Sequence, residues 1–531
     1  MSTLIPKRSV LISVIAVLIA SISSLLGLTP LALSQNGDPS DPGFVNTLEQ
    51  LASSVRLEST LAGNLQDFSI EKVRLQANQK QLLAQRAEEY KQLAERDPTN
   101  ADLHYQFSLI LQTLGQNTGA RQALQNALRL DPNMKKARNQ LGILSISEDR
   151  AASETQFRAA MSGESKVLEA KNNLGALFAV EGRFTEAADF LRDATTDQSS
   201  YPEAHLNLGY VLMALRDYKN AEGEFRQVLR LRSNSVSALS GFGIVSVKLG
   251  RGQEAVEILQ RVVRIWPDSA GAHSNLAMAL ATDGFDLPGA LAEFSQAIQL
   301  EQSSPFAYYG RGKILNEMKR LEEARSDLEI ACRLKPDYPE ALYLLAQIER
   351  QLGNVQHSAD LLKNVVKLQP DNLDAQLSLG RSLVSLGQLE EAVQHLRQAA
   401  QLSPNNPDVL YNLGQTLNKM GRSEGKIYLE RFQRVKRQIE IDDRVQHLGS
   451  YGLEAAAKKD WPEAVKDFQE AIELCGQCAS LEDLHRNLGL IYVLKGDVEE
   501  GRRELEAALK MKPTDSDARR ALESLPTDAP R

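Results

Sequence analysis

A period of 34 residues runs through most of this 531-residue chain and limits what it can fold into. In the stretch that begins at Leu373, Gly380, Gly387 and Pro404 stand at positions 8, 15 and 32 of the unit, with leucine and alanine between them at helical spacing. The same pattern returns about a dozen times along the chain. Repeats of this length form stacked helix pairs that share one continuous core, so the chain is predicted to be an all-α solenoid rather than a set of globular domains.

The pattern within one unit explains why it should fold as two helices. Positions 4, 7, 8 and 11 share one face of a first helix, and positions 20, 24 and 27 share one face of a second. The two helices are expected to cross closely where positions 8 and 20 meet, and position 8 is glycine or alanine in almost every unit. Glycine at position 15 favours the left-handed conformation that ends the first helix, and proline at position 32 stops the second.

Departures from this pattern predict the domain organisation. Residues 35–45 are rich in Pro, Gly, Asp and Asn and indicate a linker, and the spacing over 46–100 predicts an N-terminal helical cap or half repeat. An array of about ten repeats is expected over 101–432. Beyond Gly421 the proline stop is missing, so we expect 433–525 to hold a bridging helix, two further repeat units and a C-terminal capping helix.

The first 34 residues have the pattern of an export signal. Lys7 and Arg8 precede an apolar run from Val10 to Leu28, and the small residues Ala32 and Ser34 follow. Either a cleaved signal peptide or an uncleaved N-terminal membrane anchor fits, since about 20 apolar residues can span a bilayer. In both cases the repeats are expected outside the cytoplasm of a bacterium, in the periplasm or secreted, with membrane contact only through 1–34 if this segment is uncleaved.

The charge pattern argues against one class of partner. Charged residues make up 24% of the chain, the net charge is −8, and both signs are spread along the sequence. Nucleic-acid binding requires a basic face, so no nucleic-acid partner is expected.

The repeated residues resemble the tetratricopeptide repeat (TPR) family, and the resemblance covers about residues 101 to 513. It implies a right-handed superhelix, an α-solenoid of about 12 helix-pair repeats. Members of this family are mostly scaffolds that hold peptides or proteins in a concave groove. In two of the units, the residues that carry the resemblance are Leu413, Gly414 and Leu417, and Leu488, Gly489, Tyr492, Leu505, Ala508 and Pro513.

The same resemblance implies a candidate peptide-binding groove, because position 6 of the first helix faces the groove in this family. A carboxamide there can offer a donor and an acceptor to a bound main chain. The alternative is that asparagine at position 6 belongs to the repeat consensus and implies no particular ligand. The candidate residues are Asn173, Asn207, Asn275, Asn412 and Asn487, with Gln106 and Gln140 as near equivalents.

The histidines do not form a recognisable catalytic or metal site. His104, His205, His273 and His485 all stand at position 4 of their units, which favours rings packed between neighbouring helices over metal or acid–base roles. The nucleophile motifs, the phosphate-binding loop and the dinucleotide fingerprint are absent from the sequence. We therefore expect no catalytic residues, no cofactor and no metal.

Cys475 and Cys478 form the sharpest local motif of the chain. In an oxidising compartment the pair could close a local disulfide in the loop between two helices. A redox-active dithiol and half of a zinc site are the alternatives.

The sequence thus predicts a non-catalytic extracytoplasmic scaffold that binds protein or peptide partners in its groove. The alternatives are a substrate-binding or regulatory subunit of a separate enzyme, such as a glycosyltransferase complex, and a redox-active protein that uses the cysteine pair. A basic strip on the bridging helix is either a solvated face or a site for an acidic partner. It consists of Arg431, Arg434, Lys436 and Arg437.

Overall fold

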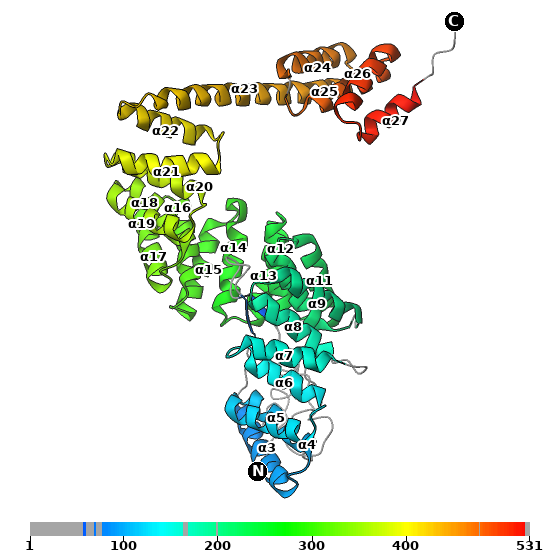
Figure 1. The fold of residues 1–531 in the computed structure, drawn as a ribbon, viewed down its shortest axis with the longest axis vertical. Coiled ribbons are helices and arrows are strands. Elements are labelled where there is room, and N and C mark those ends of the chain that lie inside the picture. The colour runs from blue at the N-terminus through cyan, green and yellow to red at the C-terminus, as the bar shows by residue number, and fades with distance from the viewer. Residues whose placement is uncertain are drawn as a thin grey trace, which may run out of the picture. The chain divides into compact units, whose positions relative to one another are not determined.

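The computed structural model describes residues 57–59, 68–70, 77–162, 168–197, 200–476 and 478–525. Within these residues the chain is a succession of paired α-helices with one short antiparallel hairpin, so the all-α solenoid fold is confirmed (Figure 1). The expected signal or anchor (1–34) and linker (35–45) lie outside the described residues. No helix of the described part is both long and apolar enough to cross a membrane.

The chain forms two compact units, which divide between Ala341 and Leu342. The division falls inside one helix, α18 (Pro339–Gln351). The sequence predicts one continuous array over 101–432, and nothing in it marks this division because the repeat pattern continues unbroken through it.

In the first unit, helix α3 (Ala77–Arg96) packs against the first of the repeats, and each repeat is a first helix packed on a second. The first helices are α4 (Ala101–Thr113), α6 (Lys135–Ser145), α8 (Leu168–Val180), α10 (Pro202–Ala214), α12 (Val236–Lys248), α14 (Ala270–Ala281) and α16 (Pro305–Glu317). The second helices are α5 (Asn117–Leu130), α7 (Arg150–Met161), α9 (Phe184–Asp197), α11 (Tyr218–Leu231), α13 (Gly252–Ile265), α15 (Leu287–Leu300) and α17 (Leu321–Leu334), and the 3-10 turn η1 (Thr282–Gly284) precedes α15.

The second unit continues the same plan until a long helix changes it. After α18 come α19 (Val355–Leu368), α20 (Leu373–Ser385), α21 (Leu389–Leu402), α22 (Pro407–Lys419), α23 (Glu424–Ala457), α24 (Trp461–Cys475), α25 (Leu481–Lys495), α26 (Val498–Met511) and α27 (Ser516–Ser524). Helix α23 packs on α22 and also on α24, so it closes one repeat and opens the next. Its 34 residues correspond to about 50 Å of helix.

Two features define the start and the end of each first helix. From α4 to α22, the first helices begin 33 to 35 residues apart, and 34 residues apart in most cases, as the period predicts. An Asn or Ser residue before several of them accepts a hydrogen bond from the third helical amide, as Asn100, Ser235 and Asn406 do. The eight glycines at position 15 all have positive φ, from 68° to 103°. Local capping chemistry therefore places the repeats along the chain.

The close crossing of the two helices involves a different partner from the one expected. A Cβ built on Gly380 would lie 2.6 Å from Cγ of Leu396, a residue at position 24 rather than position 20. At Gly175 the same holds for Leu191, and the nearest atom at position 20 is the carbonyl oxygen of Ala187 at 3.2 Å. The side chain at position 24 reaches the crossing because helical side chains lean toward the N-terminus of their helix.

The N-terminal cap differs from the prediction of helix over 46–100. Within the described residues, helix begins only at Ala77, and two strands precede it, β1 (Leu57–Ser59) and β2 (Phe68–Ile70). They pair antiparallel, with Leu57 opposite Ile70. Strand β2 consists of Phe68, Ser69 and Ile70, and its aromatic and β-branched residues favour strand over helix.

The boundary expected at 432/433 is also shifted. Helix α23 runs without a break from Glu424, nine residues before the expected start of the bridging helix. The start at Glu424 is close to the regular start of a second helix, and the helix continues past its usual end because position 32 of this unit is Gln438, which can donate its amide inside a helix, where the preceding unit has Pro404.

Candidate peptide-binding face

The first helices of the first unit lie side by side. Besides packing on its own second helix, α8 contacts α6 and α10, α12 contacts α10 and α14, and α14 contacts α16. Side chains at positions 5 and 6 join α6, α8 and α10, as the contacts of Asn139 with Asn173 and of Asn172 with Asn207 show. We call the side of the first helices that carries positions 5, 6 and 9 the first-helix face. It is the surface to which the resemblance assigns the ligand.

Three of the candidate asparagines are buried on this face. Asn173 on α8 and Asn207 on α10 are 0% exposed, and Asn275 on α14 is 9% exposed. Gln140 on α6, the near equivalent in the preceding repeat, is 0% exposed. Four carboxamides thus lie in the interior of the first unit, where each polar atom needs a partner.

A chain of hydrogen bonds connects two of the candidates through two asparagines that the sequence analysis missed. Asn207 Nδ2 donates to Asn172 Oδ1 at 2.8 Å, and Asn172 Nδ2 donates to Asn173 Oδ1 at 3.0 Å. Asn173 Nδ2 then donates to Asn139 Oδ1 at 2.9 Å. The signal that could have revealed this chain is the pairing of carboxamides at positions 5 and 6, in Asn139-Gln140 and Asn172-Asn173.

Unmet hydrogen-bonding capacity lies on the carboxamides beside the chain of asparagines. A carboxamide has two N–H donors and two acceptor lone pairs. Among the described residues, neither Oε1 nor Nε2 of Gln140 has a hydrogen-bond partner, and neither does Oδ1 of Asn275. A buried polar atom without a partner costs about 1–3 kcal/mol, so a segment that supplied the missing partners would recover this cost on binding.

Two glycines interrupt the row of carboxamides at position 6. A Cβ on Gly241 would lie 2.4 Å from the ring of Phe225, and a Cβ on Gly310 would lie 2.3 Å from the ring of Phe294. Both rings come from position 24 of the preceding repeat and fill the space that a carboxamide would need.

The other candidates do not join the chain of asparagines. Gln106 is half-buried on α4. Asn412 on α22 and Asn487 on α25 belong to the second compact unit and are half-buried, and Asn412 Nδ2 donates to the carbonyl of Asp408 at 2.7 Å. The candidate face is therefore restricted to the first unit.

The histidines at position 4 have a shared structural environment. Nδ1 of His205 lies 2.6 Å from Glu224 Oε2, and Nδ1 of His273 lies 2.6 Å from Glu293 Oε2, each joining the two helices of one repeat. His485 makes the equivalent contact with Glu504 at 2.5 Å. His104 and His273 also approach the carbonyl of a proline six residues earlier through Nε2, at 3.3 and 2.8 Å. In the described part of the chain, no group of three His, Cys, Asp or Glu residues could hold a metal ion.

Cys475 and Cys478 are joined by a disulfide between the end of α24 and the start of α25. Gly476 between them has a φ of 60°, which a glycine adopts without strain. Cys332 is the one free cysteine of the described residues. Burial raises the pKa of its thiol to about 11, so it is almost entirely protonated and unreactive at neutral pH.

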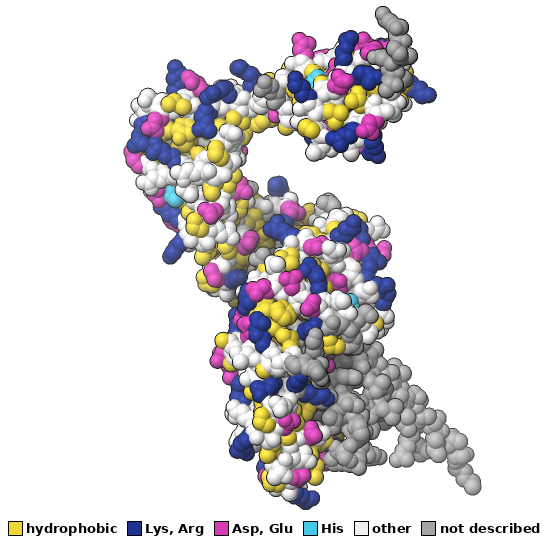
Figure 2. All heavy atoms as spheres, turned by 45° about the vertical axis from the view of Figure 1, so that its right-hand side comes forward, with side chains coloured by type: hydrophobic (Ala, Val, Ile, Leu, Met, Phe, Trp, Pro, Cys, Tyr) yellow, Lys and Arg dark blue, Asp and Glu magenta, His cyan; other side chains and the backbone are white. Residues whose placement is uncertain are grey.

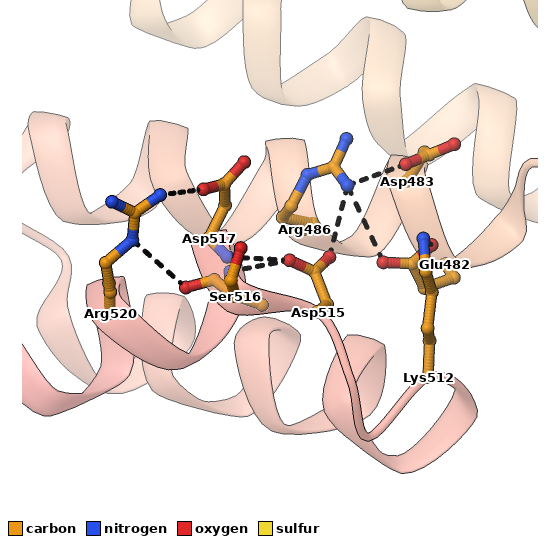
Figure 3. A network of polar contacts seen from close by, with 9 residues as sticks. Glu482, Asp483, Arg486, Lys512, Asp515, Ser516, Asp517 and Arg520 are labelled. Carbon is orange, nitrogen blue, oxygen red and sulfur yellow. Dashed lines mark hydrogen bonds and ion pairs between the residues drawn. The ribbon is translucent and has the colours of Figure 1, made fainter. Parts of the chain in front are cut away.

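A network of acids and bases closes the C-terminal end of the second unit (Figure 3). Asp515 Oδ1 caps α27 by accepting from the amides of Asp517 and Ala518, and Arg486 Nη1 from α25 lies 3.1 Å from its other oxygen. The neighbouring Glu482, the capping amides and Arg486 hold the pKa of Asp515 well below its usual range, and the proximity of Asp515 raises the pKa of Glu482. The network anchors the capping helix and contains no exposed reactive group.

Charges elsewhere on the surface are mixed. Figure 2 shows Lys and Arg side chains interspersed with Asp and Glu over the face drawn. Of the basic strip on α23, Arg431 donates to the carbonyl of Pro404, and Lys436 lies 3.8 Å from Glu440. Arg434 and Arg437 line a shallow open depression along the same helix. The strip is thus partly engaged in structural contacts.

Comparison with known proteins agrees with the repeat pattern. Models of the tetratricopeptide repeat match residues 101–134, 206–270, 241–307, 276–339, 380–421 and 484–515. A model described as anaphase-promoting complex, cyclosome, subunit 3 matches residues 327–399.

Individual relatives are similar over part of their length. The type IV pilus assembly protein PilF of Pseudomonas aeruginosa is 28% identical over 140 residues, which are 26% of this chain and 55% of PilF. Anaphase-promoting complex subunit 3 of Schizosaccharomyces pombe is 24% identical over 156 residues, 29% of this chain and 23% of that protein. The crystal structure of YrrB, a TPR protein with an unusual peptide-binding site, has 24% identity and a TM-score of 0.33, and the match covers 34% of this chain and 94% of YrrB.

The chain matches only about half of PilF and less of the yeast protein, so these relatives are similar in their repeats and not over their full length. Repeat proteins of this kind are typically scaffolds for protein–protein interaction. From the repeat matches between residues 101 and 515 and from the paired helices, the chain belongs to the tetratricopeptide repeat family.

Proposed function

We propose that this chain is a non-catalytic scaffold that holds an extended segment of a protein partner on its first-helix face. The observation that carries the proposal is the buried row of carboxamides, with unpaired polar atoms on Gln140 and Asn275 at either side of the asparagine chain. A peptide main chain offers both N–H and C=O groups at regular intervals, which is the pattern that such carboxamides can satisfy.

The proposal places this scaffold outside the cytoplasm of a bacterium, in the periplasm or secreted. Its support is the sequence of residues 1–34, which lie outside the described residues, and the disulfide between Cys475 and Cys478, which is stable in an oxidising compartment. The partner is then another envelope or secreted protein.

Affinity capture from bacterial envelope extracts tests the proposal. The full-length chain is compared with a variant in which Asn173, Asn207 and Asn275 are all changed to Ala, and with a matched control that carries Asn412→Ala and Asn487→Ala. We expect the first variant to lose its partners while the control keeps them, with the helical circular dichroism signal unchanged in both. If the triple variant captures the same proteins as the wild type, the first-helix face is not the binding surface.

Gln140 allows a sharper version of this experiment. Because its amide is buried without partners, Gln140→Met removes the unpaired groups at nearly constant volume and should raise the stability of the free protein by about 1 kcal/mol. The same change removes a group that the ligand would pair with, so capture should weaken. A variant that is more stable and binds less well fits only a binding role for Gln140, whereas lower stability would show that its amide is already satisfied.

The identity of the captured proteins separates the scaffold from the alternative of an enzyme subunit. A catalytic chain, such as a glycosyltransferase, that co-purifies in fixed ratio would support the alternative. Captured proteins without such a chain support the scaffold.

A further inference from the structure

Helix α10 is buried around its whole circumference. Every residue from Glu203 to Ala214 is buried. At position 9, Tyr210 packs on Phe225 of α11 and donates to the carbonyl of Ser237, so packing between repeats covers it. At position 5, Leu206 is 4% exposed, whereas Tyr411, the equivalent residue of α22, is 45% exposed. Packing between repeats leaves position 5 of α22 open, so the burial of Leu206 points to a further segment over α10.

Helix α8 shows the same property over its central part. All residues from Asn172 to Ala179 are buried. Three of the four asparagines of the chain, Asn172, Asn173 and Asn207, lie on these two helices, so the cover and the candidate face overlap.

The N-terminal hairpin lies against these two helices. Strand β1 contacts α10, and strand β2 contacts α8. With Glu58 opposite Ser69 in the antiparallel register, the hairpin places one extended strand on each of the two first helices. It belongs to the same compact unit as both helices.

We propose that the segment carrying β1 and β2 is an internal ligand of the first-helix face, and that an external partner must displace it to bind. This inference rests on the proposed function and adds to it in two ways. It gives an independent reason for the extended form of the partner segment, because the internal occupant is itself extended. It also makes binding regulated, because the chain competes with its partner for one surface.

The energetics favour an occupant that can be exchanged. Two paired strands of three residues are at most marginally stable in water, so the hairpin depends on its contacts with α8 and α10. The short connection from Ile70 to the start of α3 at Ala77 keeps it at an effective concentration on the order of millimolar. The apparent affinity of a partner is therefore its intrinsic affinity multiplied by the fraction of molecules in which the face is uncovered.

Thiol labelling in the full-length chain tests this inference without any partner. A reporter cysteine is placed by Leu206→Cys on α10 or, as a matched control at the same position of a repeat, by Tyr411→Cys on α22, both with Cys332→Ser. The hairpin is then broken by Glu58→Pro with Ser69→Pro, which removes backbone donors from both strands. The pair Glu58→Ala with Ser69→Ala is the control that keeps the donors.

With the hairpin intact, we expect the thiol at position 206 to react at least about tenfold more slowly than the one at position 411, since labelling then requires local opening. The proline pair should accelerate labelling at position 206 by about tenfold and leave position 411 unchanged, and the alanine pair should have little effect. Equal rates at the two positions in the intact chain would overturn the inference, and so would slow labelling at position 206 that persists after the proline changes.

The outcomes also separate this inference from the proposed function. If labelling behaves as expected but the asparagine variants capture partners normally, the hairpin covers a face that does not bind them. If the asparagine variants lose partners but labelling at position 206 is unaffected by the proline pair, the face binds partners without internal competition. If the asparagine variants lose partners and the proline pair accelerates labelling at position 206, the proline pair should also increase partner capture.

Discussion

At the scale of single residues, the close approach of the two helices in each repeat decides which side chains are allowed. Gly380→Ala would bring its Cβ to 2.6 Å from Leu396, so we expect the change to destabilise the protein by about 1–3 kcal/mol, more than the roughly 1 kcal/mol that alanine gains in a helix. Gly223→Ala on α11 meets no atom within 4 Å and should stabilise instead by about 0.5–1 kcal/mol. The shift of the urea unfolding midpoint measures the change in stability of each variant. A change of the same sign in Gly380→Ala and Gly223→Ala would contradict this account of the packing.

The sequence predicted which positions carry the candidate carboxamides but not how they are connected. Asn173 and Asn207 follow from the period, whereas their link through Asn172 depends on how far neighbouring first helices are offset, which the period does not specify. The gaps at Gly241 and Gly310 depend on rings from the preceding repeat. They could have been anticipated only by comparing position 24 of one unit with position 6 of the next.

At the scale of helices and their ends, position 15 adopts the left-handed conformation in most units, with or without glycine, and Asp149 is the exception. Arg216, Lys319 and Lys459 occupy this position with φ of 61° to 62°. Because this conformation costs a residue with a Cβ about 1 kcal/mol and glycine almost nothing, Lys319→Gly should raise stability by up to about 1 kcal/mol. The reverse change at Gly250, which has open space for a Cβ, should lower stability by about the same amount. Thermal unfolding measures both, and a loss of stability in Lys319→Gly would show that the lysine side chain matters more than the backbone conformation.

The end of the second unit depends on the cap of α27. Asp515→Ala removes the acceptor for two helix amides and the partner of Arg486, so we expect a loss of about 1–2 kcal/mol in the stability of this end at pH 7. The pKa of Asp515 is lower in the folded state than in the unfolded state, where it is about 3.9. The contribution of Asp515 to the free energy of unfolding is therefore complete above about pH 3.9 and decreases as the pH falls toward the folded pKa. Urea unfolding from pH 7 down to pH 3 should show the wild type and the variant converging below about pH 4. A difference that grows on acidification would contradict the assignment.

Elements differ in how far the sequence determines them. The start of each first helix from α4 to α22 follows from the repeat because caps, glycine and proline act locally. The strands β1 and β2 do not follow in this way. Three-residue strands have almost no pattern of their own and exist through contacts with helices more than a hundred residues away.

At the scale of the whole molecule, the account describes a chain whose repeats build a surface and whose N-terminal segment covers part of it. The first unit contains the row of carboxamides, the unpaired atoms on Gln140 and Asn275, and the hairpin. The second unit contributes the long helix α23 and a firmly capped end. The central claim is that partners bind to the first-helix face of the first unit and not to the second helices behind it.

Site-specific photo-crosslinking in living cells tests this claim most directly. A photoreactive residue is placed on the first-helix face at Met278 or Lys313, beyond the helices that the hairpin covers, or on the exposed side of the second helices at Arg230 or Arg264. The account predicts crosslinks to a distinct partner protein from positions 278 and 313 and none from positions 230 and 264. Crosslinks that form only from positions 230 and 264 would contradict it.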